Sequence, residues 1–340
     1  MHRTSFFFRL IFPCGLLLGV LLLCICAGSV SIPLSDTLAC LWNSLLGKPI
    51  PEGIAKSIIL SVRLPRVLCV ALCGAALSIC GACMQGLLRN PLADGSTLGV
   101  SAGASLGAVI SMAFDIRIPG IPYGGTMVMA MLFAFGSLLL ILLLAFSMDR
   151  TFSTSSIILI GVIFSMFASS ITSLVITFSG EKIRSITFWT LGSLSGSNMT
   201  YAGILCLALC LCASLILLHN RELDALAMGE ENAQHIGVSV RRVKLVLLIA
   251  VSVLIGICVS TGGTIAFVGL IVPHMTRMLT GPSHRQLLPV SLLFGAIFLL
   301  LADLVSRTLL SPIELPIGVI TSIVGSVLFL IIFLRSRRRR

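Results

Sequence analysis

Long apolar segments, separated by short polar ones, make up most of the chain. The run LIFPCGLLLGVLLLCICAGSV near the start is long enough to cross about 30 Å of hydrocarbon as a helix, and VITSIVGSVLFLIIFL near the end is similarly apolar. The apolar positions are continuous and do not alternate with polar ones, which indicates helices and not the strands of a barrel. Inside lipid a helix also satisfies every backbone amide within its own segment.

The pattern predicts ten helical segments. They span residues 10–30, 60–86, 95–114, 123–147, 153–178, 201–219, 241–261, 264–279, 286–307 and 314–335. The third and eighth segments are short and rich in Gly, Ser or Pro, so we expect them to pack inside the bundle. The expected fold is therefore one all-α transmembrane domain over residues 1–340, with a polar loop at 220–240.

The basic residues predict the orientation of this domain. Of the 340 residues, 57% are hydrophobic and 10% are charged, against about 25% charged in a soluble domain. Ten crossings put both termini on one side, and fifteen of the 23 Lys and Arg residues then share that side. Because cytoplasmic loops are enriched in Lys and Arg, both termini are predicted to be cytoplasmic. The net charge of +11 then reflects topology and attraction to anionic lipid, and we expect no nucleic-acid partner.

The first apolar segment and the cysteines each have a second interpretation. Arg3 and Arg9 before an apolar run ending in CAGS resemble a secretory signal peptide, but the run is long, so we expect a retained first helix. Cys80 and Cys83 form a CxxC motif within a predicted helix, with no second pair or His nearby. We interpret the twelve cysteines as packing residues and predict no metal site.

The stretch GVSAG raises the question of a nucleophilic serine at Ser101, since Gly-x-Ser-x-Gly is a hydrolase motif. A hydrolase elbow follows a strand and needs His and acid partners, whereas here a helix and an Asn90-Pro91 break precede the serine. Asp94 or Ser96 is a candidate cap for the next helix. We expect Ser101 to be a packing or path-lining residue beside a stripe of glycines that admits a close helix neighbour, namely Gly99, Gly103 and Gly107.

Three arginines are predicted at the outer membrane surface. Arg63 and Arg66 lie three residues apart at a helix start, and Arg307 falls on the same side. They are either interfacial anchors or a site for carboxylates, which the planar guanidinium binds well. Asp303 and Arg307 are four residues apart and are expected to form an ion pair on one helix.

Residues 221–245 form the longest mixed-charge stretch of the chain. Leu223, Leu226 and Ala227 pattern as a short amphipathic helix that ends at Gly229. Glu230 and Glu231 begin a second helix, which Gly237 ends. This pattern favours a cytoplasmic docking element, with an ordinary solvated loop as the alternative. Further on, four basic residues are expected near the same surface: His274, Arg277, His284 and Arg285. The two histidines have no Cys or carboxylate neighbours in the sequence that would complete a metal site.

These segments together resemble the membrane subunits of ABC importers for iron-siderophore complexes, haem and cobalamin. The motifs that carry the resemblance occur in order from about Arg63 onward: RLPR, GAALSICGACMQGLLRNPLADGSTLGVSAGA, LAMGEENAQHIGV, GTIAFVGLIVPHMTRML and ADLVSRTLLSPIELPIGVITSIVG. The chain departs from the family at Gly95, where Pro is usual, and at Gly325, Ser326 and Val327, where Gly-Ala-Pro is usual. Neither departure touches the arginines or the mixed-charge loop.

The resemblance implies a fold, partners and roles for particular residues. It implies ten helices per subunit, a second permease subunit that is identical or a close paralogue, two cytoplasmic ATPase subunits and an external binding protein. It assigns the pocket for the binding protein to Arg63, Arg66 and Arg307. It assigns contact with the ATPase to the 223–237 stretch, and within it to Leu223, Leu226, Gly229, Glu230, Glu231, Ala233 and Gly237. It assigns the cytoplasmic gate to Thr154 and Ser155.

The same resemblance predicts a transport subunit of the cell membrane with no catalytic residue and no cofactor of its own. The sequence lacks the GxxxxGK[ST] phosphate-binding loop, so ATP and Mg²⁺ would be used by the partner. A ferric siderophore is the expected cargo, with haem or cobalamin as the alternative. A secondary transporter is a further alternative, but it would be expected to carry ionisable residues deep in its helices, and Asp303 is the only acidic candidate.

Overall fold

A computed structural model of the chain describes residues 2–28, 30, 32–48, 54–119, 124–148 and 154–337. Within these ranges the regular structure is helical, and no extended strand is present. The helices are α1 (His2–Cys26), α2 (Leu34–Leu45), α3 (Ile54–Ser57), η1 (Ile58–Arg63), α4 (Leu64–Leu87), η2 (Gly95–Leu98), α5 (Val100–Ala113), α6 (Gly124–Met148), α7 (Thr154–Thr177), η3 (Gly180–Lys182), α8 (Ile183–Thr190), α9 (Met199–Leu218), α10 (Asn220–Ala227), α11 (Glu230–His235), α12 (Val240–Gly262), α13 (Val268–Thr280), α14 (His284–Thr308) and α15 (Ile317–Arg337).

Each of the ten predicted segments corresponds to a helix. Six helices of the described chain are long and apolar enough to cross a membrane: α4 with its π-helical start, α6, α7, α9, α12 and α14. The apolar parts of α1, α5 and α15 are shorter. The predicted short segments are α5 and α13, and α5 packs between α6, α7 and α12. The all-α membrane fold expected from the sequence is therefore confirmed.

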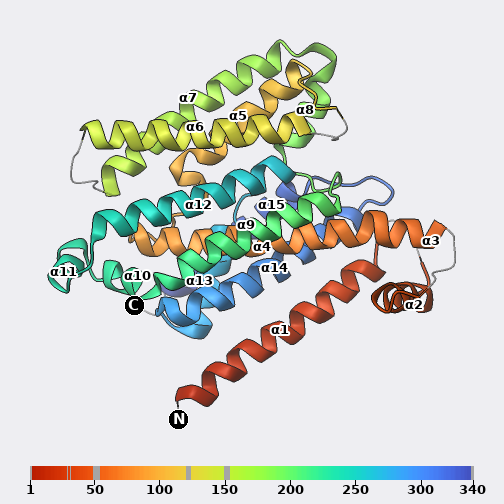
Figure 1. Cartoon of the computed structure of the whole chain (residues 1–340), viewed down its shortest axis with the longest axis horizontal. Helices are drawn as coiled ribbons and strands as arrows, with labels where there is room; N and C mark the ends of the chain where they lie inside the picture. The colour runs from red at the N-terminus through yellow and green to blue at the C-terminus, as the bar shows by residue number, and fades with distance from the viewer. Residues whose placement is uncertain are drawn as a thin grey trace.

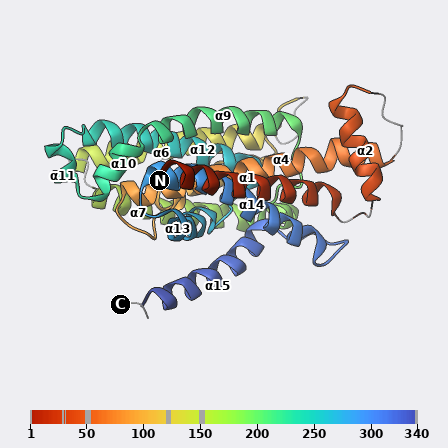
Figure 2. The ribbon, with the colours of Figure 1, turned by 90° about the horizontal axis from the view of Figure 1, so that it is seen from below.

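The bundle is built around α4, which is enclosed by α9, α12, α13 and α14 (Figure 1). The group α5, α6 and α7 covers one flank, and α1 lies on the opposite flank against α14 (Figure 1). The start of α1 and the end of α15 lie at the same end of the bundle as α10 and α11, while α2, α3 and α8 lie at the other end (Figures 1 and 2). The charge argument predicts that the end with α10 and α11 faces the cytoplasm, and we call the two ends cytoplasmic and outer on that basis.

Small residues allow the central helices to approach one another closely. A Cβ on Gly74 of α4 would collide with the carbonyl of Gly295 on α14, and one on Gly81 of α4 with the carbonyl of Gly269 on α13. Close backbone approach of this kind is how helices associate in lipid, where burial alone provides little driving force. The central helices therefore fix the relation between the two ends of the molecule.

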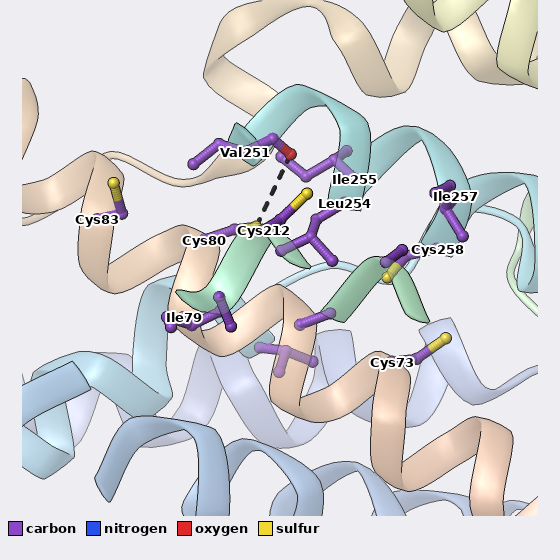
Figure 3. Packing of buried hydrophobic residues seen from close by; sticks show 14 of the residues in the cluster. Cys73, Ile79, Cys80, Cys83, Cys212, Val251, Leu254, Ile255, Ile257 and Cys258 are labelled. Carbon is purple, nitrogen blue, oxygen red and sulfur yellow. Dashed lines mark hydrogen bonds between the residues drawn. The ribbon is translucent and has the colours of Figure 1, made fainter. Parts of the chain in front are cut away.

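The cysteines of α4 lie in the buried core, as the sequence predicted (Figure 3). Cys80 donates a weak hydrogen bond to the carbonyl of Val251 on α12 over 3.8 Å. Cys83 is buried, and Cys258 of α12 belongs to the same cluster (Figure 3). Within the described ranges, no group of three or more His, Cys, Asp or Glu residues is arranged to hold a metal ion.

The structure differs from the expectations at the start of α5 and at two short helices. Residues Gly95–Leu98 form the separate turn η2, and α5 itself begins at Val100 with Gly99, at φ of 77°, as its N-cap. A positive φ of this size favours glycine over any residue with a Cβ.

Helices α2 and α8 were not predicted, because they are short and amphipathic. In α2 the exposed apolar residues recur every four positions on one face, a pattern that fits a helix lying along the membrane surface, and they are Leu34, Leu38 and Trp42.

Candidate functional site

The three arginines meet at the outer end of the bundle, around two carboxylates. Arg66 donates from Nε to Asp303 Oδ1 over 3.0 Å and from Nη1 to Glu314 Oε2 over 2.8 Å. The Nε of Arg307 lies 3.1 Å from Asp303 Oδ2, which is the ion pair predicted from their spacing. We call Arg63, Arg66, Asp303, Arg307 and Glu314 the arginine cluster. Its three positive and two negative groups leave an excess of one positive charge.

Two members of the cluster bind the last turn of α1. Arg63 donates from Nη1 to the carbonyls of Ile25 over 2.9 Å and Cys26 over 2.8 Å, and also bonds the carbonyl of Val30. Arg307 donates from Nη2 to the carbonyl of Cys24 over 2.6 Å. The last carbonyls of a helix lack partners within it and carry its negative dipole end, so cations are favourable there. The arginines therefore fasten α1 to α4 and α14.

The burial of these arginines was not foreseen. Arg63, Arg66 and Arg307 are 4%, 7% and 3% exposed, and Asp303 is fully buried. All members of the cluster except Asp303 line a small cavity of about 160 Å³, together with Gly28 and neighbouring apolar residues. The sequence placed the arginines together but did not identify Glu314 as a counter-ion. The available signal was that Glu314 lies seven residues after Arg307, in the segment that joins α14 to α15.

The cytoplasmic end carries the two short helices predicted there. Gly229, with φ of 124°, separates α10 from α11, and Gly237, with φ of 90°, ends α11. Leu223, Leu226 and Ala233 are fully buried, whereas Ala227 is exposed, contrary to the amphipathic pattern predicted for it. The buried residues anchor the two helices against the bundle, so any partner must contact other side chains of this element.

Two apolar side chains of this element face outward. Met228 and Ile236 are 63% and 65% exposed, at the ends of α10 and α11. Neither residue was predicted as a contact residue from the sequence, although both flank the glycines that end the two helices. Their side chains are accessible to a partner at this end of the molecule.

Helix α10 is also tied to the start of α14. The backbone N–H of His284 donates to Asp224 Oδ1 over 2.8 Å, and the Ser283 hydroxyl donates to Asp224 Oδ2 over 3.1 Å. The Nδ1 of His284 lies 2.6 Å from Asp224 Oδ1. Asp224 thus acts as an N-cap supplied by another helix, and α10 is bound to a helix that reaches the arginine cluster at its other end.

We expect Asp224→Ala to destabilise the protein by about 1–2 kcal/mol, the usual range for loss of an N-cap. Asp224→Asn, which keeps an acceptor, should retain most of that stability. Thermal unfolding of the purified protein in detergent would measure both. Glu222→Ala is the matched control, because Glu222 lies on the same helix and makes no hydrogen bond or ion pair with the described residues. Equal loss in the Asp224 and Glu222 alanine variants would contradict the capping role.

The predicted gate residues lie beside the same element. The Thr154 hydroxyl donates to Glu230 Oε1 over 2.9 Å, and Glu230 Oε2 lies 2.7 Å from Lys244 Nζ. Thr154 is the first residue of α7, and Ser155 next to it is exposed. Glu230 therefore joins α7, α11 and α12 at the cytoplasmic end.

A cavity of about 440 Å³ lies between α4, α5, α7 and α12, and Ser101 lines it. Three further serines on α5 and α7 face the same space: Ser105, Ser165 and Ser169. Among the described residues no histidine lines the cavity, and its one carboxylate is that of Asp94, so the His and acid pair of a hydrolase is not present beside Ser101. A hydroxyl-lined space between membrane helices is suited to passage of a polar solute.

The glycines beside Ser101 face the opposite way, toward α6. A Cβ on Gly103 would lie 2.5 Å from Ser137 Oγ and 2.9 Å from the Phe133 carbonyl, and one on Gly107 would meet the Met129 carbonyl. Gly99 instead caps α5 in a left-handed conformation. The stripe is therefore a contact between α5 and α6 along Gly103 and Gly107.

Known proteins resemble this chain over most of its length. The family model described as the FecCD transport family matches residues 16–335. The chain is 42% identical over 320 residues to an uncharacterised ABC transporter permease protein, YvrB, of Bacillus subtilis, covering 94% of the chain and 91% of the relative. It is 38% identical over 330 residues to the hemin transport system permease protein HmuU of Yersinia pestis, covering 94% and 95%.

Two further matches extend the comparison. The cobalamin import system permease protein BtuC of Halobacterium salinarum is 38% identical over 291 residues, which cover 86% of the chain and 76% of the relative. A solved ABC transporter, described as of the metal-chelate type and inward-facing, superposes with a TM-score of 0.84 at 32% identity. That superposition covers 96% of the chain and 98% of the solved one.

Proposed function

The chain belongs to the FecCD transport family, and from that premise we propose that it is the membrane subunit of an ATP-driven importer for an iron complex, a ferric siderophore in first place. It is an ABC transporter permease with several membrane-spanning helices. The observation that supports import is the arrangement of its ends: the arginine cluster lies at the outer end, and a docking element with exposed Met228 and Ile236 lies at the inner end.

We propose that α10 and α11 contact a cytoplasmic ATPase, one per permease subunit. The sequence has no phosphate-binding loop of its own, so the energy must come from a partner. Buried Leu223, Leu226 and Ala233 hold the element rigid, and Met228 and Ile236 supply the apolar contacts. A rigid element transmits displacement of the partner to α14 through Asp224 and to α7 through Glu230.

Charge substitution on the exposed tip tests this contact. We expect the double variant Met228→Glu and Ile236→Glu to lose most ATPase binding, because it places two charges in an apolar interface, while thermal stability stays within about 0.5 kcal/mol, as for exposed positions. Co-purification of the ATPase would measure binding. Leu218→Glu, at a 73% exposed position on α9 close to the same end, is the matched control. Unchanged co-purification in the double variant would contradict the proposed contact.

We propose that a second permease subunit covers α7. Only 22% of the most apolar part of α7 is buried, the smallest share among the six long helices of the described chain. Its exposed residues include hydroxyls as well as large apolar side chains, for example Ser169, Ser170 and Phe167. With a second copy on this face, the serine-lined cavity would adjoin a shared central path.

The external partner would dock at the outer end through carboxylates. The arginine cluster has an excess positive charge and opens on a cavity at that end, which favours an acidic surface. Because the guanidinium groups are buried, docking would require carboxylates to reach the rim beside Glu314, the partly exposed member of the cluster.

The cargo is inferred from relatives whose names give hemin and cobalamin and from a structure described as of the metal-chelate type. These share a metal held in an organic chelate, and a ferric siderophore has the same chemistry. Mass spectrometry of the ligand retained by the cognate binding protein, followed by uptake into proteoliposomes with ATP, would test this. Retention of haem or cobalamin would replace the siderophore proposal, and uptake driven by an ion gradient without ATP would reject the importer.

A further inference from the structure

Glu230, the first residue of α11, contacts Thr154, the first residue of α7 and one of the two predicted gate residues. We propose that Glu230 is a positioning residue that makes the start of α7 follow the movement of α11. The inference rests on the proposed function, in which α11 contacts the ATPase, and on the gate that the family resemblance assigns to Thr154 and Ser155 at the start of α7. It adds a specific link between these two parts, which lie 76 residues apart in the chain.

The two contacts of Glu230 differ in how easily they break. Lys244 is 1% exposed on its side chain, whereas Glu230 is 31% exposed. Separating the carboxylate from a buried ammonium group breaks an ion pair that is largely shielded from water, which is strongly unfavourable. Glu230 and Lys244 therefore hold α11 to the first turns of α12 as one unit.

The contact with α7 is the weaker of the two. It is a single hydrogen bond from the neutral hydroxyl of Thr154 to a partly exposed carboxylate oxygen. Because Lys244 fixes the carboxylate to α12, the bond to Thr154 is the step that passes a displacement of α11 to the start of α7. Removing this bond frees α7 and leaves α11 and α12 joined.

Removing only the Thr154 hydroxyl isolates this link. Thr154→Val keeps the shape of the side chain and leaves the ion pair of Glu230 with Lys244 intact. A hydrogen bond to a charged group changes an equilibrium by roughly tenfold or more, so we expect cargo transported per ATP hydrolysed to fall by about tenfold. Thr154→Ser should restore it. Glu230→Gln weakens both contacts, so adding Thr154→Val to it should change little beyond the effect of Glu230→Gln alone.

The experiment uses the full chain with its ATPase and binding protein in proteoliposomes, and measures ATP hydrolysis and cargo uptake together. Thr177→Val is the control, because Thr177 lies at the other end of α7 and its hydroxyl donates to the Ser173 carbonyl of the same helix. A second readout is labelling of Ser155→Cys by a charged maleimide, in a background with exposed Cys14, Cys206 and Cys210 replaced by Ser.

The proposal predicts that Thr154→Val removes the difference in labelling at position 155 between nucleotide-free and vanadate-trapped complexes, while Thr177→Val retains it. The role of Glu230 would be wrong if the wild-type protein transports normally and Thr154→Val keeps both the labelling difference and a normal amount of cargo per ATP. Additive effects of Thr154→Val and Glu230→Gln would also overturn it. A wild-type complex whose ATPase does not respond to the binding protein would instead reject the proposed function, and this inference with it.

Discussion

Gly103→Leu is expected to abolish transport and to reduce the amount of folded protein sharply. A leucine side chain at this position would enter the space of Ser137 and the backbone of Phe133 on α6, and neither can move aside without separating the two helices. Overpacking of a close contact costs about 1–3 kcal/mol and sometimes more, and here the obstacle includes backbone. Fluorescence-detected size-exclusion chromatography and uptake would measure folding and transport.

Two controls separate this effect from leucine substitution in general. Gly136 lies on α6 with open space where a Cβ would project, so Gly136→Leu should fold and transport normally. Ser101→Ala should be nearly silent, because the serine lines a cavity and the described residues place no histidine beside it. Normal folding of Gly103→Leu, or a loss of transport in Ser101→Ala as large as in Gly103→Leu, would contradict the interpretation of the glycine stripe.

The long helices could be predicted from the sequence because their signal is local. An apolar run of sufficient length must be a helix in lipid, whatever it packs against. The Asp303 and Arg307 ion pair could be predicted for the same reason, since four residues on one helix fix the geometry. The short helices α10 and α11 were marked by glycines that both have positive φ.

Contacts between distant segments could not be predicted in this way. Arg63 binds carbonyls 37 and 38 residues earlier in the chain, and Arg66 binds Glu314 across 248 residues. Nothing in the spacing of these residues indicates that the arginines are buried and already paired. The start of α5 was misplaced because Asp94 and Ser96 are typical caps, whereas the chain uses a left-handed Gly99. Tertiary packing decides such cases, and one sequence alone does not contain the pairing.

The pairing inside the arginine cluster leads to the second large effect. Asp303→Asn is expected to destabilise the protein by about 3–5 kcal/mol, because it leaves Arg66 and Arg307 in a buried site with their shared carboxylate removed. Glu314→Gln should cost much less, since that side chain is 32% exposed and water can replace it. Thermal unfolding in detergent would measure both variants. Similar stability of the two would contradict the structural role of Asp303.

Variants of the same cluster can test docking separately from the stability of the fold. Reversing the charge of all three arginines would bury carboxylates beside Asp303, so loss of transport in that variant would report misfolding as readily as lost docking. Glu314→Gln removes the negative charge that Arg66 Nη1 now pairs with and leaves a weaker neutral acceptor in its place. If the binding protein docks through carboxylates, this variant should bind it several-fold more tightly, and Arg66→Met more weakly.

Surface plasmon resonance with the reconstituted permease would measure both affinities. Weaker binding in both variants, in proportion to their loss of stability, would show that the cluster only fastens α1 to the bundle and that the binding protein docks elsewhere on the outer end.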